Sequence, residues 1–222
     1  MSESAAETKK KLLESAKKEF LEKGFNGASL RSIAANAGVT TGAMYRHFKD
    51  KNAFFCALVD DVIDYVTQMI MLANTENHAL FDSVAIEKHM SYETESAKAL
   101  INYMYGNFDA FTLLLTKSAG STHENFQNEI CDIYTKNFDR IYKWMYKQKI
   151  ATRKIPPMTV HTIASTVINA YCEIVLHKME KKDALAYMES IIEFFNYGCM
   201  HMMGIPCEEQ YSFIALIISS TL

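Results

Sequence analysis

The stretch VTTGAMYRHFKDK, from Val39 to Lys51, gathers side chains that are suited to contacting a polyanion. A guanidinium, an imidazole, a phenol and two ammonium groups lie here among small residues. Arginine and lysine bind phosphate oxygens, and arginine also donates to the acceptor edges of bases. A helix that only filled a core would not need this mixture. The stretch therefore indicates a surface that contacts another molecule.

The order of these residues predicts a short helix with two unlike faces. At about 100° per residue, Met44 and Phe48 point one way, whereas Gly42 and Arg46 point almost directly opposite. Because the residues on the outer face are small, no large side chain projects from it, and it can approach base edges and thymine methyl groups closely. The opposite, apolar face is expected to pack against the rest of the protein.

A second helix precedes this one and is separated from it by a tight turn. Its apolar stripe is Leu30, Ile33, Ala34 and Ala37, at the spacing of one helical face. Ser29 can cap its start, Gly38 can end it, and Thr40 or Thr41 can cap the next helix. Free amides at that second start can also bind phosphate. This order, a helix, a tight glycine turn and a second helix with a polar face, is the helix-turn-helix pattern. In that pattern the second helix enters the major groove of DNA.

A first helix is predicted in front of this motif. Ser4 and Glu7 have capping-box spacing, and Gly24 suits the left-handed position after a helix end. Phe25 then lies where it can contact Phe20, the contact that accompanies such a stop.

The rest of the chain also has helical patterning. Asp50 can cap a long apolar helix over residues 54–71, and further helices are predicted at 82–104, 107–117, 122–149, 158–178, 182–203 and 208–219. Only three prolines occur, and no segment has convincing strand alternation. The expected fold is all-α, with a helix-turn-helix DNA-binding domain at 1–51 and a helical effector-binding and dimerisation domain at 52–222.

Charge and cysteine usage narrow the class of protein. Residues 1–51 carry 10 Lys/Arg against 6 Asp/Glu, whereas the remainder carries 13 against 20, so the positive end can face a polyanion. The cysteines are odd in number and widely spaced, which favours reduced, buried thiols: Cys56, Cys131, Cys172, Cys199 and Cys207. The N-terminus has no apolar signal region, and no 18 apolar residues run together. A cytoplasmic protein without a membrane span is expected.

The segment SLRSIAANAGVTTGAMYRHFKDKNAFFCAL resembles the DNA-binding signature of the tetracycline-repressor (TetR) family, and the likeness runs from Lys10 to Leu58. It implies that the DNA-facing residues are Arg31, Thr41, Gly42, Ala43, Tyr45, Arg46, His47 and Lys51. Thr40 is added to this set because the free backbone amides at the start of the helix can bind phosphate. A lysine in the first turn of a helix opposes the helix dipole, and a phosphate would make Lys51 favourable there. The resemblance further implies a homodimer on a palindromic operator in double-stranded DNA, with a four-helix bundle at the interface and a ligand cavity within each subunit.

Two features of the C-terminal part bear on dimerisation and on the ligand. The helices at 158–178 and 182–203 have apolar stripes too broad for one-sided burial, so either a second subunit covers the excess or both helices lie in the core. Aromatic residues that can line a cavity, or simply fill the core, are Tyr103, Phe108, Phe111, Phe126, Tyr134, Phe138 and Tyr171. Asn169 and Glu173 are polar residues one turn apart in an apolar helix, and they can face either the cavity or the dimer interface.

Other chemistry has little support in the sequence. Cys199, His201, Met202 and Met203 are soft ligand types, but Met and Cys more often fill helix interfaces. HExxH spacing, a Gly-rich phosphate loop and a GxSxG elbow are all missing, so no catalytic residues, cofactor or metal are predicted. The function expected is a DNA-binding transcriptional regulator, namely a repressor that a small, largely apolar effector of unknown identity releases from its operator. The alternatives are a helical enzyme or carrier with an incidental basic N-terminus, and sequence-independent binding to the nucleoid.

Overall fold

The computed structural model describes the backbone of residues 4–81 and 86–205, and the side chains of residues 4–71 and 94–205. Every regular element in these ranges is helical, which confirms the all-α fold. The elements are α1 (Ala5–Gly27), α2 (Leu30–Asn36), α3 (Thr41–Tyr45), α4 (Lys51–Phe81), α5 (Ile86–Gly106), α6 (Phe108–Thr112), the π-helical turn η1 (Leu113–Lys117), α7 (Phe126–Lys147), α8 (Pro157–Leu176) and α9 (Lys181–Met203). The helix predicted at 208–219 and Cys207 lie outside the described residues.

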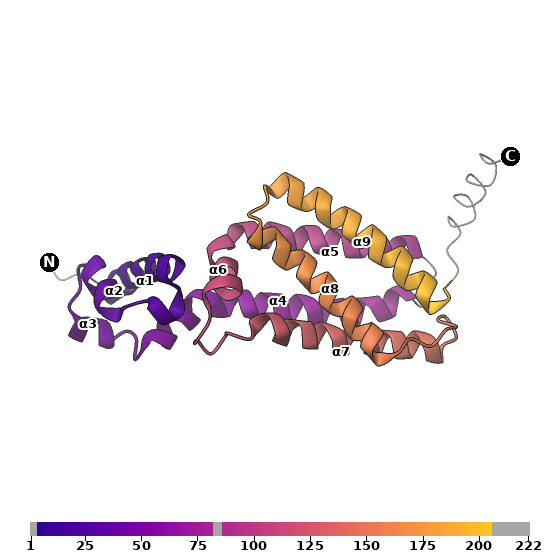
Figure 1. The fold of residues 1–222 in the computed structure, drawn as a ribbon, viewed down its shortest axis with the longest axis horizontal. Coiled ribbons are helices and arrows are strands. Elements are labelled where there is room, and N and C mark those ends of the chain that lie inside the picture. The colour runs from indigo at the N-terminus through magenta and orange to yellow at the C-terminus, as the bar shows by residue number, and fades with distance from the viewer. Residues whose placement is uncertain (1–3, 82–85, 206–222) are drawn as a thin grey trace.

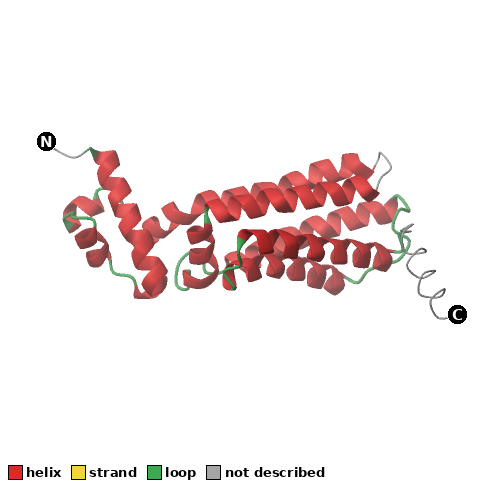
Figure 2. Ribbon diagram, turned by 90° about the horizontal axis from the view of Figure 1, so that it is seen from above, coloured by secondary structure: helices red, strands yellow, loops and turns green. Residues whose placement is uncertain are grey.

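The molecule is elongated, with a small helical unit at one end and a larger bundle at the other (Figure 1). Helices α1 to α3 form the small unit, and α4 leaves it to run along the bundle of α5, α7, α8 and α9. Short helix α6 lies at the junction, and the second view shows the same arrangement (Figure 2). Because α4 belongs to both ends, a movement of α4 in the bundle can reach the small unit.

Capping side chains define the starts of the first four helices, as the sequence predicts. The caps are Ser4, Ser29, Thr40 and Asp50, whose oxygens accept from the backbone N–H groups of Glu7, Ser32, Ala43 and Ala53 at 3.2, 3.4, 3.2 and 2.7 Å, respectively. Each cap satisfies an amide that has no partner within its helix. Of the two threonines that can start α3, the structure selects Thr40.

The glycine stops are confirmed at one position and modified at the other. Gly38 has φ of +68°, and the N–H groups of Gly38 and Val39 donate to Ala35 and Ala34 at 3.0 and 2.9 Å. This is the Schellman pattern that ends α2. Gly24 has φ of +69° but only kinks α1, which continues to Gly27. The predicted contact between Phe20 and Phe25 is present, with ring centroids 5.9 Å apart.

An aromatic core joins the small unit to α4. The rings of Phe20 and Phe25 both pack edge-on against Phe55, with centroids 5.4 and 5.5 Å away. Phe48, which follows α3, stacks on Phe54 at 3.9 Å. All five side chains are buried, so the end of α3 is held directly on the first turn of α4.

Two buried polar groups fix α2 against α1. The hydroxyl of Ser15 donates to the carbonyl of Ile33 at 2.8 Å. The carboxylate of Glu19, only 4% exposed, accepts from the N–H of Ser29 at 3.1 Å and from Lys23 Nζ at 2.9 Å. Burial alone would raise the pKa of Glu19, but the hydrogen bonds from Lys23 and Ser29 and the charge of Lys23 outweigh it and lower the pKa from its ordinary value of 4.5.

We expect Glu19→Ala to lower the free energy of unfolding by about 1–3 kcal/mol, because the N–H of Ser29 loses its buried acceptor. Glu19→Gln keeps an acceptor and is the matched control. A lowered pKa in the folded state gives stability that is present at neutral pH and is lost as the pH falls through that pKa. Urea unfolding at several pH values should therefore show the difference between wild type and Glu19→Gln shrinking on acidification. A difference independent of pH would mean that the charge of Glu19 does not contribute.

The apolar stripe of α8 is covered within one subunit. Its members are buried or half-buried in the single subunit, as the core alternative predicts for this helix: Val160, Ile163, Ala164, Val167, Ile168, Tyr171, Ile174 and Val175. By length and composition, α8 alone among the described helices is apolar enough to cross a membrane, a test that core helices also pass. Within the bundle, α8 packs against α6, η1, α7 and α9.

Among the described cysteines, the prediction of burial has one exception. Cys131, Cys172 and Cys199 are buried. Burial, together with the negative charge of Glu173, raises the pKa of Cys172 to about 11. Cys56 was also expected to be buried, and this is wrong: its thiol is partly exposed on α4, because it faces a loop instead of a packed helix.

Candidate nucleic-acid interface and effector domain

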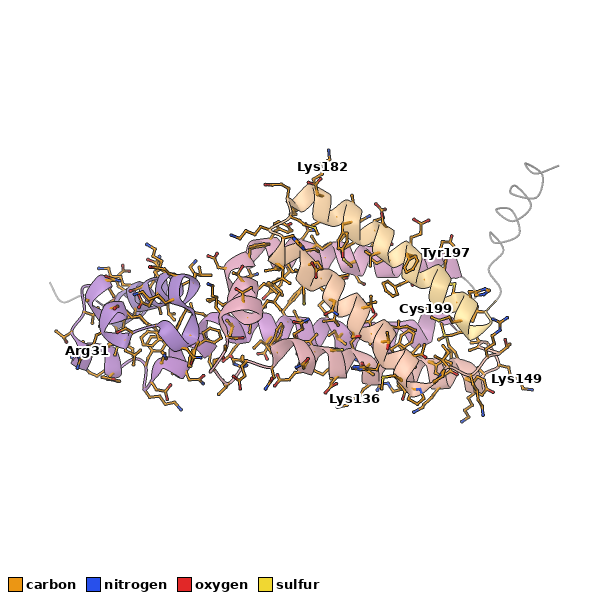
Figure 3. All side chains as sticks on the ribbon, in the orientation of Figure 1. Arg31, Lys136, Lys149, Lys182, Tyr197 and Cys199 are labelled. Atoms are coloured by element: carbon orange, nitrogen blue, oxygen red, sulfur yellow. The ribbon has the colours of Figure 1, made fainter. Side chains whose placement is uncertain are left out.

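The predicted DNA-facing residues lie on α2, the turn, α3 and the start of α4, and none of them is buried. Arg31, Thr40, Thr41, Gly42, Tyr45 and Arg46 are exposed, whereas Ala43, His47 and Lys51 are half-buried. Arg31 lies at the end of the molecule farthest from Tyr197 and Cys199 of α9 (Figure 3). Lys49, which is not among the predicted DNA-facing residues, is also exposed, and its positive charge beside the motif is the signal that could have indicated it.

Helix α3 has the two faces that the sequence predicts. Met44 is completely buried and Phe48 is 5% exposed, whereas Tyr45 is 52% exposed. Arg46 and His47 follow α3 directly, and their N–H groups still donate to Ala43 and Met44 at 3.3 and 2.9 Å. The residues after α3 are therefore held by helical hydrogen bonds, with the exposed guanidinium at its C-terminal end.

Gly42 has no structural requirement for glycine. A Cβ built at this position would meet no atom within 4 Å, and its φ is not positive. Glycine inside a helix costs about 0.5–1 kcal/mol relative to alanine. A helix surface without a side chain permits close approach of another molecule, as the predicted DNA-facing role of Gly42 requires.

We expect Gly42→Ala to stabilise the fold by up to about 1 kcal/mol and yet to weaken operator binding. The added methyl group stands between the helix and the base edges, at a cost of about 1–3 kcal/mol, comparable to one lost base contact. Thermal unfolding and DNA titration measure the two effects. Gly106→Ala, another open position at the end of α5, is the control that should leave DNA binding unchanged. Unaltered operator affinity in Gly42→Ala would remove this face from the interface.

Lys51 has an intramolecular role that the sequence did not reveal. Its ammonium group donates to the carbonyls of Asn26 and Ala28 at 3.2 and 3.3 Å and lies 4.8 Å from the centroid of the Phe25 ring. The lysine therefore closes the C-terminal end of α1, where carbonyls lack helical partners. An ammonium group has three donors, so these two bonds do not use all of them. The phosphate contact stays a prediction beside this structural role.

The aromatic residues expected around a ligand do not form one group. Six of them belong to or pack against the main core, namely Tyr103, Phe108, Phe111, Phe126, Tyr134 and Tyr171. Phe138 instead packs against a second core at the far end of the bundle, where Tyr142 and Met145 are buried. The packing therefore does not favour a single cavity that Phe138 shares with the other six aromatic residues.

Tyr103 is the best-defined member of this set. Its ring stacks on Tyr65 with centroids 3.5 Å apart, and its hydroxyl donates to the carbonyl of Asp61 at 3.3 Å. Burial, and then the negative charge of Asp61 and the neighbouring Tyr65, raise the pKa of the Tyr103 phenol. The phenol is thus neutral and already donates to the protein, so a ligand would have to compete for it.

Of the two positions predicted for Asn169 and Glu173, facing the cavity or facing the dimer interface, the single subunit does not place them in its interior. Asn169 is exposed and accepts from Gln127 Nε2 at 2.7 Å. The Glu173 side chain is 44% exposed and pairs with His177 at 2.8 Å. The apolar pattern of α8 reveals which residues are alike but not which side faces the bundle. Their exposure removes them from the interior, and the dimer interface stays as the open alternative.

The soft-ligand residues near the end of α9 are divided between interior and surface. Cys199 and Met203 are buried, whereas His201 and Met202 are exposed. A metal ion requires three or four ligands that converge on one point.

Comparison with known proteins relates the N-terminal part of the chain to a known family. Residues 12–58 match the family described as bacterial regulatory proteins of the tetR family. The transcriptional repressor BepR of Brucella suis is 47% identical over 55 residues, which are 25% of this chain and 26% of BepR. An HTH-type transcriptional regulator of Staphylococcus aureus is 29% identical over 144 residues, 64% of this chain and 69% of that protein. The BepR match thus spans about a quarter of that relative.

Solved structures extend the likeness of the fold to both ends of the molecule. NalD of Pseudomonas aeruginosa, the secondary repressor of the MexAB-OprM multidrug efflux pump, has a TM-score of 0.58 at 16% identity and covers 86% of this chain and 97% of its own. The regulator FadR of Bacillus subtilis, solved with stearoyl-CoA, has a TM-score of 0.53 at 17% identity and covers 85% and 98%. With the helix-turn-helix geometry of α1 to α3, the match of residues 12–58 identifies the N-terminal part of the chain as a tetR-family DNA-binding region. The solved structures show that the chain as a whole shares the all-helical fold of such regulators.

Proposed function

We propose that the protein is a DNA-binding transcriptional repressor, released from a palindromic operator when a small, largely apolar ligand binds the C-terminal domain. The observation that carries this proposal is the split surface of α3. Met44 and Phe48 anchor the helix in the core, while Gly42, Tyr45 and Arg46 are presented outward. A helix held in this way offers its outer face to the major groove. Residues 1–51 would act as the DNA-binding domain and residues 52–222 as the effector-binding and dimerisation domain.

Apolar groups exposed on α8 and α9 support a homodimer. Phe194 is 71% exposed, and Met158 and Leu176 are 72% and 50% exposed. A shallow hollow of about 500 Å³ surrounds Phe194, lined by Ser190, Glu193, Phe194, Tyr197, Gly198 and His201. A twofold-related α9 would cover the ring and fill the hollow with the same side chain from its partner. The two α3 helices would then lie about 34–36 Å apart, one turn of B-DNA.

The effector is proposed to act through α4. This helix begins at Lys51, directly after the predicted recognition helix, and extends for 31 residues into the bundle. A ligand packed among the core aromatics against α4 can tilt it and move α3. NalD, named as a repressor of a multidrug efflux pump, and FadR, solved with stearoyl-CoA, support an apolar or amphiphilic ligand. As a regulator of bacterial genes, the protein would work in the cytoplasm.

A mobility-shift assay against the DNA that flanks the protein's own coding region tests this function. We expect a discrete complex that excess random DNA does not compete away, and whose affinity falls as salt is raised. Equal affinity for random DNA would favour sequence-independent nucleoid binding. Binding to neither DNA would favour the enzyme or carrier alternative.

Reciprocity tests the effector half of the proposal. A coupling of about 1–3 kcal/mol would change the affinity for operator DNA 5- to 150-fold. Bound operator DNA must then lower the affinity for the ligand by the same factor. Calorimetry of a candidate ligand with and without operator measures both sides. Identical ligand affinity in the two titrations excludes that ligand as the inducer.

A further inference from the structure

Three metal-ligating side chains meet where α4 passes the loop between η1 and α7. Cys56 and Asp60 lie one helical turn apart on α4, and His123 approaches them from the loop. The Nε2 atom of His123 is 3.4 Å from Cys56 Sγ and 3.0 Å from Asp60 Oδ1. All three ligand atoms lie within 4.8 Å of one another, and theirs is the one such group found among the described residues.

A hydrogen-bond relay does not account for this arrangement. In a catalytic Cys-His-acid relay, the two partners contact different ring nitrogens of the histidine. Here both partners approach the same nitrogen, Nε2. One imidazole nitrogen carries at most one proton, so it can donate to only one of the two partners. Three electron-pair donors directed at a common point match the coordination of a cation.

We propose that Cys56, Asp60 and His123 form a binding site for a divalent transition-metal ion of the zinc type. Bond lengths of about 2.3 Å to sulfur and about 2.0–2.2 Å to nitrogen and oxygen give tetrahedral S···N and N···O separations of about 3.6 and 3.4 Å. The observed separations of 3.4 and 3.0 Å need only small adjustments. The Asp60 side chain is 53% exposed and free to rotate toward sulfur.

The ligand set determines the kind of site. One thiolate, one imidazole and one carboxylate suit zinc, and three protein ligands leave a fourth position for water. Cys56 must bind as the thiolate, so each ion that binds releases the thiol proton to solvent. Affinity should therefore increase with pH.

Neighbouring polar groups support the ligands. Asn52 Nδ2 donates to Cys56 Sγ at 3.4 Å, and Thr122 Oγ1 lies 3.6 Å from the same sulfur. Asn52 Oδ1 accepts from the N–H of Thr122 at 3.0 Å, which holds the loop against α4. Hydrogen bonds of this kind orient ligands and stabilise the charge on a coordinated thiolate.

The location connects the site with the DNA-binding unit. The same loop passes so close to α1 that a Cβ at Gly120 would lie 2.1 Å from Asn26 Oδ1. Asn26 in turn accepts from Lys51 at the start of α4. An ion that joins His123 to Cys56 and Asp60 would therefore fix the loop, α4 and the end of α1 as one piece. This regulatory consequence rests on the proposed function, whereas the metal site does not.

The test uses the full-length, reduced protein after treatment with a chelator. Titration with Co²⁺ should give one ion per chain, with the thiolate-to-cobalt charge-transfer band and the intense visible bands of a tetrahedral site, and Zn²⁺ should bleach both. Cys56→Ser should abolish the charge-transfer band. Asp60→Asn, at an exposed position where folding is not at risk, should weaken binding at least about 10- to 100-fold, and His123→Gln likewise.

Cys131→Ser and His201→Gln are the matched controls, because they remove a cysteine and a histidine elsewhere and should leave the titration unchanged. Circular dichroism verifies that each variant is folded. A charge-transfer band that survives in Cys56→Ser, or wild-type protein that binds no Co²⁺ in a tetrahedral site, overturns the proposal.

The regulatory consequence is measured separately. Zn²⁺ should change the affinity for operator DNA about 5- to 150-fold in wild type and leave it unchanged in Cys56→Ser. Equal effects of Zn²⁺ on both proteins would overturn the regulatory role. Absence of operator binding with and without Zn²⁺ would count against the proposed function, while the Co²⁺ titration still decides the metal site.

Discussion

Phe194→Glu is expected to convert the proposed homodimer into a folded monomer. The phenylalanine ring is 71% exposed in the single subunit, so a glutamate there remains solvated and should leave the stability of the subunit nearly unchanged. In a twofold interface the same change would bury two carboxylates without cationic partners. An uncompensated buried charge costs several kcal/mol, so we expect dimer formation to weaken by more than about 3 kcal/mol.

Light scattering at micromolar concentration measures the mass, and thermal unfolding monitors the subunit. Met71→Glu is the matched control, since Met71 is 51% exposed but lies on α4, outside α8 and α9. The monomer should also lose most of its operator affinity, because it cannot contact two half-sites at once. A Phe194→Glu protein that remains dimeric would place the interface elsewhere.

Arg46→Ala is expected to reduce operator affinity by about 1–3 kcal/mol, because an exposed guanidinium at the end of α3 can read a guanine with two hydrogen bonds. Titration of operator and random DNA measures the loss. Arg140→Ala removes an exposed arginine from α7 and should change neither affinity. If operator and random DNA lose affinity equally, Arg46 contacts phosphate and does not read a base.

Lys51 provides the comparison within the same surface. Loss of its charge should weaken binding to all sequences and reduce the salt slope by about one unit if it contacts phosphate. Because Lys51 also donates to Asn26 and Ala28, the unfolding of Lys51→Ala must be measured beside its DNA binding. An unchanged salt slope would leave Lys51 only its role at the end of α1.

Local patterns were sufficient to predict the helix-turn-helix unit. Caps, glycine stops and apolar stripes act between residues a few positions apart, and the structure confirms Ser29, Gly38 and Thr40 in these roles. The inward direction of Met44 and Phe48 follows from helix geometry alone. The sequence was less informative about α8, since its periodicity did not indicate that the stripe is covered within one subunit or that Asn169 faces outward.

The sequence by itself determined the all-α fold, the helix-turn-helix and which residues of α3 face outward, because backbone hydrogen bonds and side-chain spacing within a helix are local. Tertiary structure alone decided which groups from distant segments meet. Lys51 reaches carbonyls 25 and 23 residues away, and His123 lies 67 residues after Cys56 in the chain. Cys56 and Asp60 are four residues apart and therefore share a face of any α-helix that contains them. No local signal, however, indicates that a loop brings an imidazole nitrogen onto that face. Packing of α4 against that loop places it there, because long-range contacts depend on the whole fold and leave no short-range period in the sequence.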